Sequence, residues 1–490
     1  MRVLLINQFF WPDPAATSQF LTDLARGLAL EGHSVTAICS ASQYVHRGDA
    51  EDAEKTDGIR IVRVRAARFS RGPLGRMLSY LSFYCGAFWR ALWLPKQDVV
   101  LTLTTPPLLS LVGTVVKTLR GSRHYIWEMD VYPDVAVALG VLRPGSAATR
   151  VLGALARFSR GRADGVIALG ECMKERLGGG NVTVIDNWAD SREIQVLAFP
   201  GGPWTVAARE SEQDRSVEYA AENMPARMPA RPAESPRHEG VFIAIDGPEG
   251  QGDSLTVAAR MRSVADRDSE QDRCVEDAVE NVSARVPTRQ AEAYATSSCP
   301  ARRDSATLTV LYSGNLGLAH DVDTVAGAMK ELREDGRIKF VFAGGGPRRA
   351  ALEGSGAEFR PYCERGRLAE SLGGCHIGLV TQKPATLGCV VPSKTYALMA
   401  AGRAVLFIGP RAATPARIIE RFGCGWQVEC GDVAGLCGLL DHLAGHLEEV
   451  EEAGRLAREA FLAEYDFSRA FERFRGALGI DGRGAEVAEA

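Results

Sequence analysis

The chain has 490 residues, 46% of them hydrophobic, so it is long enough for more than one domain and apolar enough for sizeable cores. Its net charge of −4 argues against nucleic acid as a main partner, and no apolar run approaches the roughly 20 residues that a membrane-spanning helix needs. Eleven cysteines are scattered without a Cys-x-x-Cys pair, which argues against a disulfide framework or a cysteine-based zinc site and favours the cytoplasm.

The first half of the chain alternates predicted strands with predicted helices. It begins with a short buried strand, which we interpret as structure rather than a signal peptide. Residues 17–30 carry apolar side chains at helical spacing between strands at 3–6 and 34–38, which makes one βαβ unit. Further strands are predicted at residues 59–64, 98–103, 124–127, 165–168 and 182–185. This alternation is typical of a parallel sheet covered by helices on both faces.

The same pattern starts again near residue 307. Strands are predicted at 307–312, 338–343, 377–380 and 404–408, and helices at 323–332, 348–353, after Pro392, and at 415–422, 436–447, 450–465 and 469–478. We therefore predict an α/β fold with two Rossmann-like, doubly wound domains that face a cleft. The predicted N-terminal domain spans residues 1–198 and the C-terminal one 304–465, followed by a helix and tail at 466–490. Ligands of such sheets bind beyond the carboxyl ends of the strands.

Between the two domains lies an insertion, residues 199–303, of different composition. It is rich in Glu, Arg, Ala, Ser and Pro, and it repeats the sequences TVAAR and SEQDR. Two copies are too few for a solenoid, and the composition buries little surface, so we predict mostly disorder. Within it, residues 240–254 resemble a phosphate loop, but Asp253 stands where such a loop needs lysine. We do not expect catalysis there.

Two glycine-rich turns and one lysine predict a phosphate site in the second half. The sequence SGNLG leaves the strand at 307–312, and AGGGP follows the strand at 338–343. Glycines let the backbone approach a ligand closely. The sequence VPSK then places a lysine at a predicted helix start, where free amides attract anions. The predicted donor-binding residues are Gly314, Asn315, Gly317, Gly344, Gly345, Gly346, Arg348, Pro392, Ser393 and Lys394. Ordinary turns and a solvated helix-end cation are the structural alternatives.

Carboxylates follow the buried strand at 124–127 of the first half. A carboxylate at that edge of the sheet can take the proton of an attacking hydroxyl. We predict Asp130 as the catalytic base, with capping of the turn before Pro133 as its structural alternative. The other residues that we assign to the acceptor side are Trp11, Thr17, Ser18, Glu128 and Asp134.

Residues 65–93 are both basic and aromatic. Five arginines interleave with large apolar side chains: Arg65, Arg68, Arg71, Arg76 and Arg90 with Phe69, Leu78, Tyr80, Leu81, Phe83, Phe88, Trp89 and Trp93. An amphipathic basic stretch suits an anionic lipid surface, so we predict peripheral contact with the inner face of the plasma membrane. The alternative is a core helix with a solvated basic edge.

Taken together, the motifs resemble those of a known family. They are NQFFWP (7–12), DVYPD (130–134) followed by ALGVL (138–142), VIDNW (184–188), LYSGNLGLAHD (311–321) and VPSKTY (391–396) with Gly402 and Arg403. The chain is similar to GT-B glycosyltransferases of family 4 (group 1), near the subfamily of L-fucosamine (N-acetyl-fucosamine) transferases of surface-polysaccharide assembly. The resemblance covers residues 1–198 and 304–480.

The resemblance implies a function and a separate role for each domain. The C-terminal domain would hold a nucleotide sugar, most simply a UDP-sugar, and the N-terminal domain a lipid-linked glycan acceptor. Transfer would retain the anomeric configuration and require no metal or cofactor. Asp130 lies in the Asp-x-(Trp/Tyr)-Pro motif of this group, and Lys394 would neutralise the leaving diphosphate.

The chain departs from the wider family at several positions. Asn315 and His320 stand where many members have Arg and Lys, and Cys389 and Ala397 occupy the positions of two glutamates spaced eight apart. Two alternatives therefore remain open: a GT-B UDP-sugar 2-epimerase and a non-catalytic GT-B binding protein. Both predict the same fold.

Overall fold

The computed structural model describes residues 1–13, 15–41, 54–67, 73–197, 199, 307–363 and 365–480. All of these described residues belong to one compact unit. The predicted insertion, including its repeats and residues 240–254, lies outside the described residues except for Phe199. That residue is buried and belongs to the core of the C-terminal sheet.

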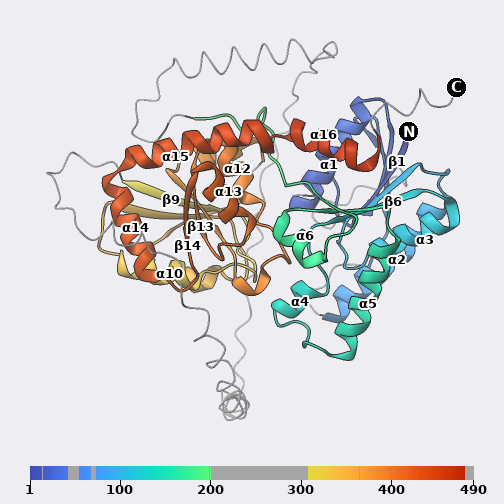
Figure 1. The fold of residues 1–490 in the computed structure, drawn as a ribbon, viewed down its shortest axis with the longest axis horizontal. Coiled ribbons are helices and arrows are strands. Elements are labelled where there is room, and N and C mark those ends of the chain that lie inside the picture. The colour runs from blue at the N-terminus through green and yellow to red at the C-terminus, as the bar shows by residue number, and fades with distance from the viewer. Residues whose placement is uncertain are drawn as a thin grey trace, which may run out of the picture. The chain divides into compact units, whose positions relative to one another are not determined.

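Eight strands form the N-terminal sheet, in the order β3-β4-β2-β1-β5-β6-β7-β8 (Figure 1). They are β1 (Arg2–Ile6), β2 (Ser34–Ser40), β3 (Glu54–Thr56), β4 (Ile59–Val64), β5 (Val99–Thr102), β6 (Arg123–Glu128), β7 (Gly165–Ala168) and β8 (Val182–Val184). All neighbouring pairs are parallel except β3 and β4, which are antiparallel. The predicted parallel sheet is confirmed, and the antiparallel edge strand adds to it.

Helices cover both faces of this sheet because alternate residues of each strand point to opposite sides. Val3 and Leu5 pack in one core with α1 (Ala16–Leu30) and α6 (Glu171–Leu177). Leu4 and Ile6 pack in the other core with α2 (Pro73–Trp93) and α3 (Ser110–Arg120). Two further helices, α4 (Asp134–Ala138) and α5 (Ala147–Arg162), follow β6.

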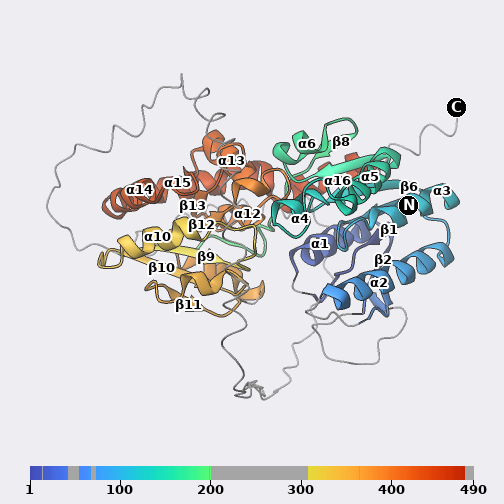
Figure 2. The same cartoon turned by 90° about the horizontal axis from the view of Figure 1, so that it is seen from below.

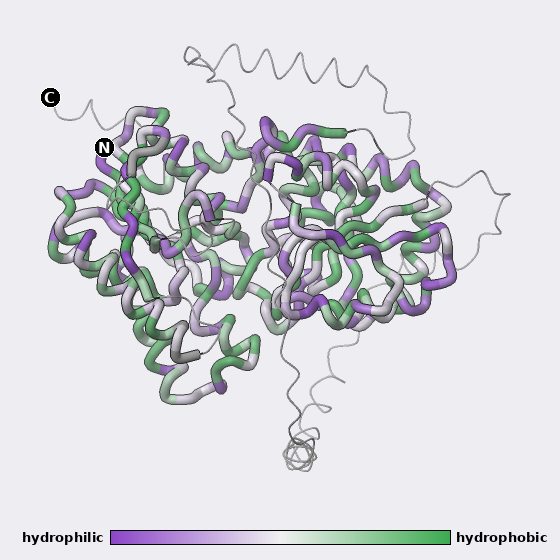
Figure 3. The backbone as a smooth tube through the Cα atoms, turned by 180° about the vertical axis from the view of Figure 1, so that it is seen from behind, coloured by the Kyte–Doolittle hydropathy of each residue, from purple (hydrophilic) through white to green (hydrophobic). Residues whose placement is uncertain are grey.

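Six parallel strands form the C-terminal sheet, in the order β11-β10-β9-β12-β13-β14. They are β9 (Leu308–Ser313), β10 (Ile338–Ala343), β11 (Glu358–Arg360), β12 (Ile377–Thr381), β13 (Ala404–Ile408) and β14 (Gly425–Val428). Hydrophobic residues, green in Figure 3, run along the strands inside both sheets. Continuous burial of this kind is what a parallel sheet with two covered faces requires.

The C-terminal sheet is also covered on both faces. Val310 and Tyr312 pack in one core with α10 (Asp323–Glu331) and α14 (Val433–Gly445). Leu311 packs in the other core with α12 (Lys394–Ala400) and α13 (Thr414–Phe422), near the short α11 (Leu368–Gly373). The long helix α15 (Leu447–Ala460) contributes to both cores, with Val450 in the first and Ala457 in the second.

The last helix returns to the N-terminal sheet. A π-helical turn, Phe461–Tyr465, leads from α15 to α16 (Phe467–Leu478), which lies near α1 in Figure 1 and near β6 in Figure 2. The ring of Phe474 lies edge-on to that of Trp127, with centroids 4.6 Å apart, and Arg475 forms an ion pair with Glu31 at 2.9 Å. The C-terminal helix is therefore part of the first core.

Candidate functional site

Two glycine-rich turns leave the neighbouring strands β9 and β10 and pack directly against each other. The Gly314 amide donates to the Ala343 carbonyl at 2.8 Å, and the Leu316 amide donates to the Gly345 carbonyl at 2.7 Å. Gly344 has a φ of +121°, and a Cβ there would lie 2.3 Å from the carbonyl oxygen of Gly314. Glycine is required at Gly344, because any side chain would collide with the backbone of the first turn.

Glycine also permits two other close approaches. Gly314 has a φ of +127°, and a Cβ there would lie 2.6 Å from Cε of Lys394. Gly346 has a φ of +128°, and its Cβ would lie 2.5 Å from the Leu316 carbonyl oxygen. At Gly317, the nearest atoms would be 3.8 Å away, so space alone does not demand glycine there. The three predicted segments around 314, 344 and 394 therefore meet at one place.

Lys394 carries a cation that lacks a counter-charge within the described structure. Its ammonium lies 5.1 Å from the centre of the Tyr312 ring, and neither a hydrogen bond nor an ion pair links it to another described residue. Burial lowers the pKa of Lys394 to about 8. A half-buried ammonium in this state is stabilised by an anionic ligand, because desolvation without a partner is costly.

The predicted helix after Pro392 is confirmed, with Lys394 as its first residue. α12 begins at Lys394 rather than at Pro392, and Ser393, in the N-cap position, makes no side-chain capping hydrogen bond. The Pro392 carbonyl instead accepts the hydroxyl of Thr395 at 3.3 Å. The chain is still non-helical at Pro392, two residues before the helix begins.

His320 lies beside Lys394 and is neutral. Its Nδ1 donates to the Thr381 carbonyl at 2.9 Å, which fixes the ring, and its Nε2 lies 3.2 Å from the Tyr312 hydroxyl. That hydroxyl donates to the Asn315 carbonyl at 2.8 Å. Burial, and secondarily the charge of Lys394, lowers the pKa of His320 to about 4. His320 therefore adds no positive charge to this site at neutral pH, which leaves that role to Lys394.

Arg348 and Tyr362 flank the second glycine turn. The Arg348 guanidinium contacts both carboxylate oxygens of Asp323, at 2.7 and 2.8 Å, so a ligand would have to compete with this ion pair. The Tyr362 ring lies over Gly345, whose Cβ would be 3.4 Å away, and its hydroxyl donates to Asn315 Oδ1 at 3.4 Å. Sequence reasoning missed Tyr362, because the edge strand β11 that precedes it was not predicted; its ring is 61% exposed and available for stacking on a ligand.

Asp130 lies against the segment that leads into α12. It forms an isolated antiparallel bridge with Val390, and the Val131 amide donates to the Cys389 carbonyl at 2.8 Å. The Asp130 carboxylate makes no hydrogen bond within the described structure. Burial, reinforced by the charge of Glu128, raises the pKa of Asp130 to about 6. Asp130, the predicted base, therefore contacts the backbone of Val390, which precedes Pro392 by two residues.

Glu128 is held in an internal ion pair. It is 3% exposed, and its Oε1 accepts from Arg160 Nε at 2.7 Å. Arg160 also donates to the Tyr132 carbonyl at 3.2 Å, while the second carboxylate oxygen of Glu128 has no partner. Burial outweighs the arginine and raises the pKa of Glu128. These contacts make Glu128 a support for the loop that carries Asp130, and sequence reasoning had not paired it with Arg160.

Asp134 also takes part in an ion pair near the same loop. Its carboxylate lies 3.1 Å from Arg176, whose Nε donates to the Leu387 carbonyl at 3.0 Å. Asp134 therefore connects α4, α6 and the segment before Val390.

The three remaining acceptor-side residues lie around the start of α1. Trp11 is 38% exposed, and its carbonyl accepts from Arg63 at 3.1 Å. Thr17 is half-buried, whereas Ser18 is buried with no partner for its hydroxyl. Within the described ranges, no hydrogen bond or ion pair joins these residues to Asp130 or Lys394. Their assignment stays a prediction.

A part-buried hydrogen bond joins α12 to the segment after β8, close to Lys394. The Tyr396 hydroxyl, on α12, donates to Asp186 Oδ1 at 3.2 Å. Burial raises the pKa of Asp186 to about 6. Two residues on, Trp188 stacks on Trp127, with ring centroids 5.6 Å apart. Sequence reasoning used this segment only as a motif and gave Asp186 no role, because its partner is 210 residues away.

Comparison with known proteins supports the fold and points to a class of chemistry. Residues 16–188 match the family described as "Glycosyl transferase 4-like domain". The chain is 24% identical over 392 residues to "Probable glycosyltransferase WbjE" of Pseudomonas aeruginosa, covering 77% of this chain and 74% of that protein.

Solved structures share the two-domain arrangement. The Anabaena protein Alr3699/HepE in complex with UDP-glucose superposes with a TM-score of 0.56 and 11% identity, covering 98% of this chain and all of that one. WaaG, a glycosyltransferase involved in lipopolysaccharide biosynthesis, gives 0.57 and 12% identity, with coverage of 98% and 100%. The fold predicted from the sequence, two Rossmann-like domains of the GT-B type, is confirmed.

Proposed function

We propose that the protein is a GT-B glycosyltransferase that moves a sugar from a UDP-sugar to a hydroxyl of a lipid-linked or polysaccharide acceptor. The observation that carries the proposal is the Lys394 ammonium. This ammonium lacks a counter-charge in the described structure, and the Lys394 side chain contacts the Gly314 turn. Lys394 also follows Val390 by four residues, and Val390 pairs with Asp130. The matched domain at residues 16–188 and the UDP-glucose bound by HepE support this assignment.

The donor diphosphate would lie between Lys394 and the two glycine turns. Charge develops on the diphosphate as its bond to the sugar breaks, and a preorganised cation in a half-buried setting stabilises that charge strongly. Because an anion favours the protonated amine, donor binding raises the pKa of Lys394 again. Tyr362 is placed to stack on the base or sugar of the nucleotide. No metal is needed for this neutralisation, although Arg348 can contribute only by leaving Asp323.

Asp130 would act on the acceptor. The acceptor oxygen forms a bond to the anomeric carbon, the bond from that carbon to the diphosphate breaks, and the hydroxyl proton passes to the Asp130 carboxylate. A base with a pKa near 6 is mostly ionised at pH 7 yet still basic enough to accept a proton. The family resemblance implies retention of configuration through an oxocarbenium-like state. Glu128 and Arg160 would hold the loop in position.

An exposed apolar face on the N-terminal domain suits a lipid-linked acceptor. Leu81, Trp89 and Trp93 of α2 are 57%, 60% and 81% exposed, while Phe83 lies in the core. α3 lies between α2 and α5 and adds the exposed Leu119. None of the described helices combines the length and hydropathy that crossing a bilayer requires. We propose peripheral contact with the inner face of the plasma membrane through this face.

The basic side chains of the predicted membrane surface divide into two groups. Arg68, Arg71 and the side chain of Arg76 lie outside the described residues, and Arg65 and Arg90 are exposed. Exposed arginines on α5, Arg150 and Arg157, add positive charge beside the apolar face. Such a combination favours anionic lipid.

The pathway is cell-surface glycan synthesis, with O-antigen, capsule or exopolysaccharide as the product. WaaG, which shares the fold, is involved in lipopolysaccharide biosynthesis. The resemblance to L-fucosamine transferases makes an N-acetylated deoxyhexosamine the first sugar to test.

A nucleotide-release assay tests this function. Full-length protein and bacterial membranes are offered UDP-, GDP- and dTDP-sugars, with and without EDTA, and free nucleoside diphosphate is measured. We expect release from one UDP-sugar that depends on membranes, persists in EDTA and is lost in Lys394→Met. Lys330→Met, an exposed lysine on α10, is the matched control. A C2-epimerised donor without release would favour the epimerase, and nucleotide binding without either reaction would favour the non-catalytic alternative.

A further inference from the structure

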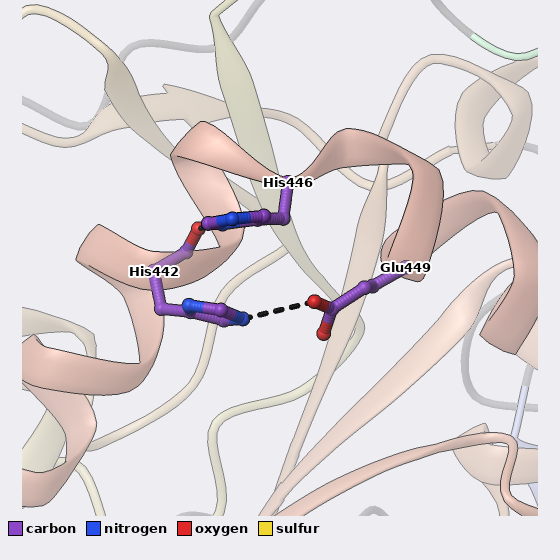
Figure 4. Close-up of side chains that lie close together, drawn as sticks. All are labelled: His442, His446 and Glu449. Atoms are coloured by element: carbon purple, nitrogen blue, oxygen red, sulfur yellow. Dashed lines mark hydrogen bonds and ion pairs between the residues drawn. The ribbon is translucent and has the colours of Figure 1, made fainter. Parts of the chain in front are cut away.

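His442, His446 and Glu449 come together where α14 meets α15 (Figure 4). One ligand atom from each side chain lies within 4.8 Å of the other two. His442 stands in the last turn of α14, His446 separates the two helices, and Glu449 lies in the first turn of α15. The spacing His-x3-His-x2-Glu places the three side chains on one side of the corner. Sequence reasoning considered cysteines only and so missed this cluster.

The hydrogen bonds of the histidines prepare them as ligands. His446 Nδ1 lies 2.8 Å from the His442 carbonyl, and because a carbonyl only accepts, Nδ1 carries the proton. The lone pair of His446 is therefore on Nε2 in the neutral ring. Metal-binding histidines in proteins are oriented in the same way, with the second ring nitrogen donating to a carbonyl or carboxylate. His442 Nε2 lies 3.1 Å from Glu449 Oε1, so a proton now occupies the position between nitrogen and carboxylate.

We propose that His442, His446 and Glu449 bind a divalent transition-metal ion, with Zn²⁺ as the natural candidate. Two imidazoles and one carboxylate are ligands that zinc favours, whereas Mg²⁺ and Ca²⁺ prefer oxygen alone. The metal takes the place of the proton between His442 Nε2 and Glu449. His442 Nε2 therefore releases its proton to solvent when the metal binds. The proposal is independent of the proposed transfer reaction, because no residue of the donor or acceptor set takes part.

The surroundings favour a cation and leave room for water ligands. The first turn of α15 is acidic, with Glu448 beside Glu449, and Glu452 follows one turn later. These glutamates line a surface depression together with Trp426. The side chain of Glu449 is 45% exposed and that of His442 23% exposed, so a bound ion keeps access to solvent.

Binding requires a small rearrangement. The two imidazole rings are stacked, with centroids 4.1 Å apart and planes 20° from parallel, so their in-plane lone pairs do not converge. Rotation of the His442 ring about χ2, a torsion with broad minima, brings its Nε2 toward the lone pair of His446. The ion would then cross-link α14 to α15. Because α15 reaches both cores of the C-terminal sheet, binding should raise the stability of this domain.

Cobalt titration of the untagged full-length protein tests the proposal, with absorption spectra as the readout. We expect one Co²⁺ with visible bands of nitrogen and oxygen coordination and without thiolate charge transfer, displaced by Zn²⁺. Glu449→Gln and His442→Gln should each weaken binding by about tenfold or more. Zn²⁺ should raise the melting temperature of the wild type but not of the double variant that combines Glu449→Gln with His442→Gln.

His33→Gln is the matched control, because His33 also faces a glutamate, Glu31 at 3.8 Å, but has no second histidine beside it. It should bind Co²⁺ like the wild type. Equal binding by the wild type and the double variant would overturn the proposal, as would absence of any Co²⁺ or Zn²⁺ binding at micromolar concentrations. Bands of thiolate coordination would assign the metal to cysteines instead. Glu449→Gln alters an exposed side chain, so loss of fold cannot imitate the expected result.

Discussion

The backbones of Asp130 and Val390 pair in an antiparallel bridge, which joins the loop after β6 to the segment that leads into α12. The carboxylate proposed as the base and the lysine proposed to bind the diphosphate are therefore connected through a few residues of backbone. A shift in one segment must move the other.

Replacing Lys394 by methionine should lower donor turnover by about 100-fold or more, the usual effect of losing one preorganised charge-stabilising group. Stability should stay the same or rise, because a half-buried ammonium without a counter-charge is removed. Nucleotide release and thermal unfolding of the same preparation check both. An equal loss in Lys330→Met would show that the effect is not specific to Lys394.

The pH dependence of kcat/KM should be bell-shaped. Activity should rise as pH increases through about 6, where Asp130 ionises, and fall above about 8, where Lys394 of the free enzyme loses its proton. Asp130→Asn should abolish turnover and leave donor binding intact. Full activity of this variant, or an acidic limb that it retains, would remove Asp130 from the mechanism.

Asp130 should also make stability depend on pH. Its pKa is raised in the folded state from 3.8 to about 6, so its protonated form favours folding. That contribution is fully present below pH 3.8 and is lost as pH rises through 6. Relative to the wild type, Asp130→Asn should therefore gain on the order of 1–3 kcal/mol between pH 4 and 7. Urea unfolding at several pH values measures this gain, and a constant difference across the range would contradict it.

Gly344→Ala should destabilise the protein by about 1–3 kcal/mol, because φ is +121° and the new Cβ would lie 2.3 Å from the Gly314 carbonyl oxygen. Donor affinity should fall as well, since the two turns must separate. Gly336→Ala is the control, because a Cβ there meets nothing within 4 Å. Chemical unfolding and nucleotide titration of both variants decide the matter, and equal stability of the two would refute the steric argument.

Tyr396→Phe removes the hydroxyl that donates to Asp186 and leaves that carboxyl buried. We expect a loss of about 1–3 kcal/mol in the free energy of unfolding, the cost of an unsatisfied buried polar group. Tyr465→Phe, on a ring whose centroid is 5.3 Å from that of Tyr396, should cost less, because the Tyr465 hydroxyl makes no hydrogen bond within the described residues. A similar loss in both variants would mean that packing rather than the Asp186 bond matters.

Trp93→Glu should weaken binding to vesicles that contain anionic lipid, because it places a negative charge on the exposed apolar face of α2. Leu30→Glu is a matched control, since Leu30 on α1 is 82% exposed and Trp93 is 81% exposed. Vesicle flotation at two salt concentrations provides the measurement. Unchanged flotation of Trp93→Glu would place membrane contact elsewhere or exclude it.

Local sequence patterns determined most of the two sheets. Strands β4, β7, β10 and β13 have the predicted bounds, because apolar residues dominate each of them. The short edge strands β3, β11 and β14 were missed, because strands of three or four residues are too brief to show a periodic pattern. The glycines at 314, 344 and 346 were identified from the turn signals alone.

Side-chain partners were decided by the tertiary structure. The sequence alone offered Glu128 and Arg348 as site residues, but the fold pairs them with Arg160 and Asp323. Asp186 meets Tyr396 across 210 residues of chain. Such pairings depend on how whole elements pack, and no periodicity within a short window contains that information.

The placement of the C-terminal helix shows the same limit. Its amphipathic pattern predicted a helix at 469–478, and α16 spans Phe467–Leu478. Nothing local says which apolar surface receives it, and its Phe474 packs on Trp127 of the first sheet. The sequence determines which face of a helix or strand is apolar. Only the folded chain decides which other helix or sheet covers that face, because hydrophobic burial is not directional.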